Sequence, residues 1–111
     1  MAATDPVPPA AAIARRLAEA AAAVAGDSWN EIRAEILPHL QALAATAHAT
    51  TQAVGAGQIS RADAGFVLEC QQLYLANILR HVRLLGRMQG RRLLDGVFAT
   101  LASLLAEAAR D

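Results

Sequence analysis

The sequence predicts an all-α fold, a small helical bundle of about four helices. Of the 111 residues, 55% are hydrophobic but only 4% are aromatic, and alanine is the commonest residue type. Alanine favours helices and allows them to approach one another closely. Apolar residues recur every three or four positions, which is the helical period. We therefore expect helices over approximately residues 9–25, 28–54, 60–89 and 95–109.

The N-terminal stretch divides into a leader and a first helix. Three prolines, Pro6, Pro8 and Pro9, lack backbone donors and disfavour helical geometry in the residues before them, so residues 1–8 are expected to form a flexible leader. Proline suits the first turn of a helix, and Gly26 suits the end of one. The apolar side chains between are mostly alanines that bury little surface. We therefore expect this helix to be the least firmly docked element.

Two signals bound the second helix. Ser28 and Glu31 have the spacing of a capping box, in which each side chain accepts a hydrogen bond from the other residue's backbone N–H. A periodic apolar run follows it. The run ends at Gly55 and Gly57, which supply the backbone freedom that a helix C-terminus needs. The second helix is thus expected to begin at Ser28 and end just before Gly55.

The third helix is the element around which we expect the rest of the chain to be organised, because apolar residues cover more than half of its circumference. Ser60 and Asp63 repeat the capping pattern at its start. Since the preceding loop is short, the second and third helices should form an antiparallel hairpin over residues 28–89, which we expect to be the core. A break between Gly90 and Asp95 is expected to separate the last helix.

Length, charge and cysteine usage narrow the class of protein. The length suits one helical domain over residues 9–111. Ten acidic residues balance ten basic ones, so no global charge attracts the chain to nucleic acid or to an anionic membrane. All the basic residues are arginines, which together with the alanines indicates a GC-rich bacterial genome. Cys70 is the sole cysteine, and no stretch has the features of a signal peptide or a membrane span, so a cytoplasmic location is expected.

The two C-terminal helices display more large apolar side chains than a bundle of this size can enclose, which is typical of an interface. Gln71 and Asn77 lie on otherwise apolar sides of the third helix, where an amide needs a partner, so we expect them to set the register of an interface. The candidate interface residues are Phe66, Leu73, Ile78, Leu85, Met88, Val97, Phe98, Leu101 and Leu105.

The expected function is therefore non-catalytic. We predict a structural or adaptor protein that forms a homo-oligomer or packs a helix face against a protein partner. The sequence has no phosphate-binding loop, paired cysteine motif or nucleophile turn, so no catalytic residue, cofactor or small-molecule substrate is predicted. Glu31, Glu35 and His39 share a helix face, but the Glu-x-x-His spacing of a di-iron bundle is absent, and no metal site is predicted.

Two alternatives from other classes remain open. The first is a membrane-active or membrane-surface protein that exposes the same apolar faces, although no span supports it. The second is nucleic-acid binding through an arginine stripe, which the neutral net charge and the lack of interleaved aromatic residues disfavour. In the competing interpretation, Glu31 and Glu35 pair with these arginines across the hairpin. The candidate anion-contacting residues are Arg80, Arg83, Arg87 and Arg91.

Overall fold

The computed structural model describes residues 8–83 and 85–109, and within these ranges the secondary structure is helical without a strand. The all-α helical bundle that the sequence predicts is confirmed. A short 3-10 turn, η2 (Gly26–Ser28), joins the first two helices. The predicted leader lies outside the described residues except for Pro8. The α-helices are α1 (Ala10–Ala25), α2 (Trp29–Gly55), α3 (Arg61–Arg80) and α4 (Arg87–Ala109).

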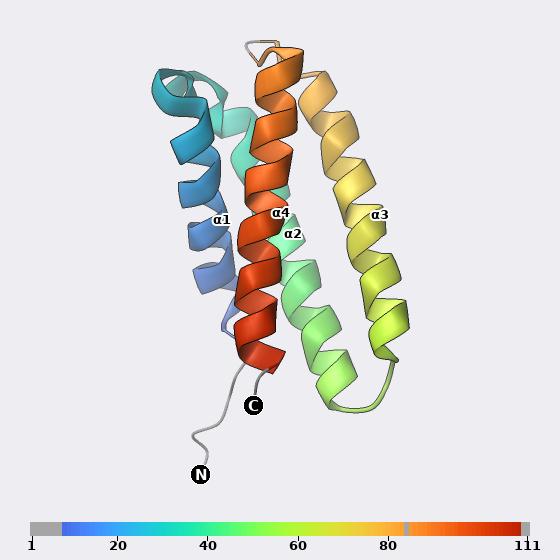
Figure 1. Ribbon diagram of the computed structural model, residues 1–111. Helices are drawn as coiled ribbons and strands as arrows, with labels where there is room; N and C mark the ends of the chain where they lie inside the picture. The colour runs from blue at the N-terminus through green and yellow to red at the C-terminus, as the bar shows by residue number, and fades with distance from the viewer. Residues whose placement is uncertain (1–7, 84, 110–111) are drawn as a thin grey trace.

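The helices form an elongated bundle in which α1 and α3 lie on opposite sides (Figure 1). Helices α2 and α4 lie between them, α2 behind and α4 in front in this view. The helix contacts run around a ring, since α1 packs against α2 and α4, and α3 packs against α2 and α4. Helices α1 and α3 are thus diagonally opposite one another, and we call them the two edges of the bundle.

The core lies where α1, α2 and α4 meet. These three helices contribute every side chain in the largest fully buried set, whereas α3 contributes only Leu75 and Leu79 to the buried residues. Burial at this level stabilises the fold by about 1.5–3 kcal/mol for each large aliphatic side chain. The largest fully buried side chains are Ile13, Leu17, Ile32, Ile36, Leu40, Leu93, Val97 and Leu101.

Helix α1 is firmly docked, so the prediction that it is the loosest element is wrong. Ile13, Leu17 and Ala21 are each 0% exposed. Small side chains explain the difference, because they let the helix axes approach. At Gly96 of α4, an added Cβ would lie 3.3 Å from Cγ2 of Val24 on α1, tighter than ordinary van der Waals contact. The alanines of α1 therefore let the large apolar side chains of α2 and α4 pack closely against this helix.

The predicted hairpin over residues 28–89 contributes part of the core, mostly from α2, whereas α3 is the least buried helix. Its buried residues, Leu75 and Leu79, both lie in its C-terminal half, and the stretch from residue 61 to residue 74 buries none. The hairpin itself is present, since α2 and α3 run in opposite directions (Figure 1). The core instead centres on α1, α2 and α4.

Local hydrogen bonds close the hairpin as its glycines and serine predict. The amide of Gln58 donates to the carbonyl of Ala53 at 2.8 Å, and that of Gly57 donates to Val54 at 3.0 Å, which together make a Schellman motif. Gly57 has the required positive φ of 76°. The capping box at Ser60 is present, because the Asp63 amide donates to the Ser60 hydroxyl at 3.0 Å.

The predicted capping box at Ser28 does not form. Residues 26–28 make a 3-10 turn, so Ser28 has helical backbone angles (φ −75°, ψ −13°) and its hydroxyl makes no capping bond. An N-cap side chain needs extended backbone geometry to reach back to the first turn. Gly26 ends α1 with a positive φ of 59°, as expected for its glycine.

The break between the last two helices lies earlier than predicted. Helix α3 ends at Arg80 rather than near residue 89, and α4 begins at Arg87 rather than at Asp95. Val82 and Leu85 in the connection are buried and fix it to the core, which explains a break without a proline or a polar loop. Gly90 lies inside α4, where an added Cβ would lie 3.6 Å from Leu85 Cδ2.

Candidate functional site

The outward face of α3 is the candidate functional surface. Phe66 is 66% exposed, Leu73 is 72% exposed and Tyr74 is 52% exposed, although all three are large apolar or aromatic side chains. Leu75 and Leu79 fix the opposite face of the helix to the bundle, which directs these residues outward. Exposed apolar patches are often functional in soluble proteins, which makes this face the candidate.

A line of uncharged residues runs along this face. Phe66, Cys70, Leu73 and Asn77 are all exposed and are separated alternately by four and three positions, so they lie on one side of the helix. We call these four residues the α3 seam. Tyr74 lies beside it, and the charged residues Asp63 and Arg80 lie at its two ends. Alternating spacings of three and four are the pattern by which two helices pack together.

The structure places the predicted interface residues in three environments. Phe66, Leu73 and Met88 are exposed, with Met88 at 74%. Ile78, Phe98 and Leu105 are partly buried against the core. Leu85, Val97 and Leu101 are buried inside the chain's own core, so their prediction as interface residues is wrong for the folded subunit. Helix α1 packs against α4 and shields Val97 and Leu101 from water, whereas Leu85 is buried in the connection between α3 and α4.

The two amides that were predicted to set a register are both on α3, and neither is a buried group without a partner. Gln71 is partly buried and Asn77 is exposed on the α3 seam. The backbone carbonyl of Asn77 lies 2.9 Å from Nδ1 of His81. Among the described side chains, no buried nitrogen or oxygen lacks a hydrogen-bond partner. A role of Asn77 in register therefore concerns an interface with another chain and remains a prediction.

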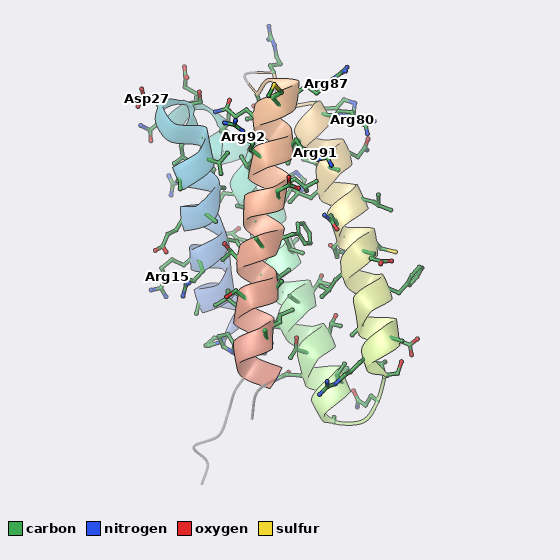
Figure 2. All side chains as sticks on the ribbon, viewed as in Figure 1. Arg15, Asp27, Arg80, Arg87, Arg91 and Arg92 are labelled. Atoms are coloured by element: carbon green, nitrogen blue, oxygen red, sulfur yellow. The ribbon has the colours of Figure 1, made fainter. Side chains whose placement is uncertain are left out.

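The predicted arginine stripe lies at the end of the bundle where α3 ends and α4 begins (Figure 2). Arg80, Arg83, Arg87 and Arg91 are all exposed. Arg91 pairs with Asp95 at 3.9 Å, and the two side chains remain 80% and 62% exposed. Surface pairs of this type contribute little to stability.

The predicted pairing of these arginines with Glu31 and Glu35 does not form. Across residues 8–83 and 85–106, the ion pairs within 4.0 Å are Arg91–Asp95 and Arg16–Glu19, each within a single helix. Both glutamates are exposed on α2. Arg80, Arg83 and Arg87 are therefore exposed to solvent without an acidic partner among the described side chains, and Arg91 pairs only with Asp95 of its own helix.

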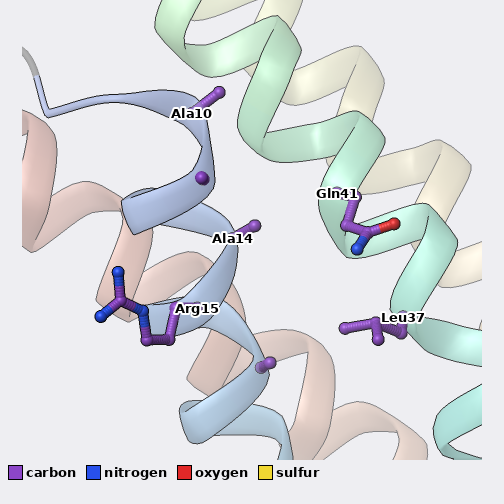
Figure 3. A pocket seen from close by; sticks show the side chains of 7 residues that line it. Ala10, Ala14, Arg15, Leu37 and Gln41 are labelled. Atoms are coloured by element: carbon purple, nitrogen blue, oxygen red, sulfur yellow. The ribbon is translucent and has the colours of Figure 1, made fainter.

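A shallow groove of about 430 Å³ lies between α1 and α2. Ala14 faces Leu37 and Gln41 across it, whereas Arg15 extends away (Figure 3). The groove is lined mostly by alanines, and the amide of Gln41 is the polar group that α2 contributes to it. A ligand site needs several convergent polar groups in an apolar pocket, which this groove does not provide.

A second hollow, of about 340 Å³, lies between α2 and the C-terminal end of α3. Glu35, His39 and His81 contribute to its lining, and the His39 ring meets Tyr74 edge-on with centroids 6.0 Å apart. The sequence placed Glu35 and His39 on one helix face but gave no sign of His81 beside them. In the described part of the chain, no group of three histidine, cysteine or acidic residues is arranged to hold a metal ion.

These features define a class, a small helical bundle whose α3 helix exposes large apolar side chains. Within residues 8–83 and 85–109, no helix combines the length and the apolar character that crossing a membrane needs. Comparison with protein-family models, with curated proteins and with solved structures gave no match. The exposed apolar face of α3 is therefore the feature of the chain that bears on function.

Proposed function

We propose that this chain is a non-catalytic structural protein that works by self-association through the α3 seam. The observation that carries the proposal is the exposure of Phe66 and Leu73, two turns apart on the same side of α3. The other edge of the bundle differs, since the exposed residues Arg15, Arg16 and Glu19 make the outward side of α1 charged. The exposed large side chains of α1 are thus all charged, whereas α3 exposes Phe66, Leu73 and Tyr74 among its charged residues.

The size of the exposed surface supports weak rather than permanent association. Phe66, Leu73 and Tyr74, with Cys70 between them, offer on the order of 300 Å² of apolar surface. A standard stable interface buries about 800 Å² on each partner. The association is therefore expected to be reversible, with a dissociation constant in the micromolar range, and to depend on protein concentration.

The setting that best fits this activity is the cytoplasm of a bacterium. Cys70 is exposed on the seam, and a reducing compartment keeps such a thiol free. The use of arginine in place of lysine supports the bacterial origin.

Light scattering across a dilution series tests the proposal. The wild-type mass should rise from one subunit towards two as concentration increases, whereas Leu73→Glu should remain a single subunit. Leu73 is 72% exposed, so this change should alter the free energy of unfolding by less than about 0.5 kcal/mol. Ala45→Glu, at an exposed position of α2, is the matched control and should associate like the wild type.

Two results would contradict the proposal. A wild-type chain that stays folded and monomeric at every concentration would exclude self-association. Association of Leu73→Glu as strong as that of the wild type would exclude the α3 seam as its site. A monomer that co-sediments with vesicles would favour the membrane-surface alternative, and one that retards nucleic acid at low salt would favour the arginine stripe.

A further inference from the structure

We propose that the surface covering the α3 seam is the α3 helix of a second copy, lying antiparallel to the first. This inference rests on the proposed self-association and adds the orientation and register of the pair. The seam residues Phe66, Cys70, Leu73 and Asn77 follow the four–three spacing at which one helix inserts side chains between those of another. The spacing therefore selects an α-helix as the occupant.

One antiparallel register matches the seam with itself over almost the whole helix. A two-fold axis midway between Cys70 and Leu73 places Cys70 opposite the partner's Leu73 and Phe66 opposite the partner's Asn77. The two helices then overlap from residue 63 to residue 80, and α3 extends from residue 61 to residue 80. Moving the register by one heptad in either direction would leave part of the seam without a facing helix.

Charge selects the antiparallel orientation. Asp63 lies at the start of α3 and Arg80 at its end, and both are exposed. In this register Asp63 lies opposite the partner's Arg80, and the two-fold axis produces this attractive pair twice. Arg61 lies just outside the overlap. A parallel pair would instead place Asp63 beside the partner's Asp63 and Arg80 beside the partner's Arg80, which is repulsive at both ends.

Asn77 is compatible with this arrangement. A parallel pair would bring Asn77 against the partner's Asn77, which is a favourable amide contact. In the antiparallel pair Asn77 lies in the last layer of the seam beside the partner's Phe66, where water reaches its amide. The amide then keeps its hydration, while the centre of the seam is formed by Cys70 and Leu73 with the partner's Leu73 and Cys70.

Cross-linking of single-cysteine variants tests the orientation. Because Cys70 is the sole cysteine, Cys70→Ala gives a cysteine-free chain into which Ala62→Cys and His81→Cys are introduced separately. Both positions are exposed and flank the proposed contact. In the antiparallel pair position 62 lies opposite position 81 of the partner, whereas two copies of the same position are about 30 Å apart along the axis.

A short bismaleimide should therefore link the mixture of the two variants and leave each variant alone unlinked. Adding Leu73→Glu to both variants is the control and should abolish the linkage. Linkage of each variant with itself would show a parallel pair and overturn the inference. A dimer by light scattering with no linkage in any sample would also overturn it, while self-association stands. A wild-type chain that is monomeric at every concentration would overturn the proposed function itself, and a Cys70→Ala chain that associates like the wild type shows that the cysteine-free background preserves the contact.

Discussion

Helices α1 and α3 form the two edges of the same bundle, yet they differ in how much of their apolar surface is buried. Helix α1 is rich in alanine and fully buries Ile13 and Leu17. Helix α3 carries more large apolar side chains but leaves Phe66 and Leu73 exposed. The difference shows that the burial of a helix depends on how closely its neighbours approach, and not on how many apolar residues it carries.

The largest expected effect is the loss of a buried leucine from α1. Leu17→Ala should lower the free energy of unfolding by about 3 kcal/mol, because Leu17 is 0% exposed and its removal leaves a cavity. Leu73→Ala is the matched control on α3 and should change it by less than about 0.5 kcal/mol. Urea denaturation at low protein concentration measures both. Equal losses for the two variants would contradict the contrast between the edges.

The close approach of α1 and α4 gives the second prediction. Gly96→Leu should destabilise the fold by about 2 kcal/mol, because its side chain would overlap Val24 of α1. Gly65→Leu, on α3, is the control, since nothing lies within 4 Å of a Cβ at that position. The higher helix propensity of leucine should stabilise this second variant by about 0.5 kcal/mol. Thermal unfolding compares them, and destabilisation of both would refute the explanation.

The third prediction concerns the charged residues at the two ends of the α3 seam. Arg80→Glu should weaken self-association about tenfold, or about 1.4 kcal/mol, because both proposed pairs with Asp63 become repulsive. Sedimentation equilibrium gives the dissociation constant. Arg33→Glu, at an exposed position of α2, is the control for net charge and should have no effect.

The combined variant Asp63→Arg with Arg80→Glu exchanges the two charges and should restore much of the affinity. An affinity unaffected by Arg80→Glu would indicate a parallel pair or another interface.

The smallest effect concerns the two predicted capping serines. Ser60→Ala should cost about 0.5–1 kcal/mol, because the Ser60 hydroxyl accepts a hydrogen bond from the Asp63 amide. Ser28→Ala should be close to neutral, since the Ser28 hydroxyl makes no capping bond. Circular dichroism during urea titration detects the difference. A larger loss for Ser28→Ala would mean that the 3-10 turn is not the state in solution.

The sequence predicted the features of the fold that depend only on residues close together in the chain. Helical periodicity gave the fold class, and α1 ends at Ala25, where Gly26 predicted its end. The Schellman motif at Gly57 and the capping box of Ser60 and Asp63 depend on contacts within a few residues, so the sequence pattern is enough to predict them.

The features that the sequence did not predict depend on packing between residues far apart in the chain. The connection before α4 is fixed by burial of Val82 and Leu85, and no local pattern distinguishes that segment from a continuing helix. The candidate interface residues lie in different environments for the same reason. Phe66, Leu73 and Met88 remain exposed, but Val97 and Leu101 are shielded by α1, a contact between residues far apart in the sequence.

The N-terminal half of α3 should open locally more readily than its C-terminal half. Leu75 and Leu79 hold only the C-terminal half, so amide hydrogen exchange should be fastest near residues 61–73, where no side chain is buried. A mating helix would slow that exchange by immobilising the segment. In the proposed pair, the part of α3 that opens most readily in the single subunit would therefore gain the most order on association.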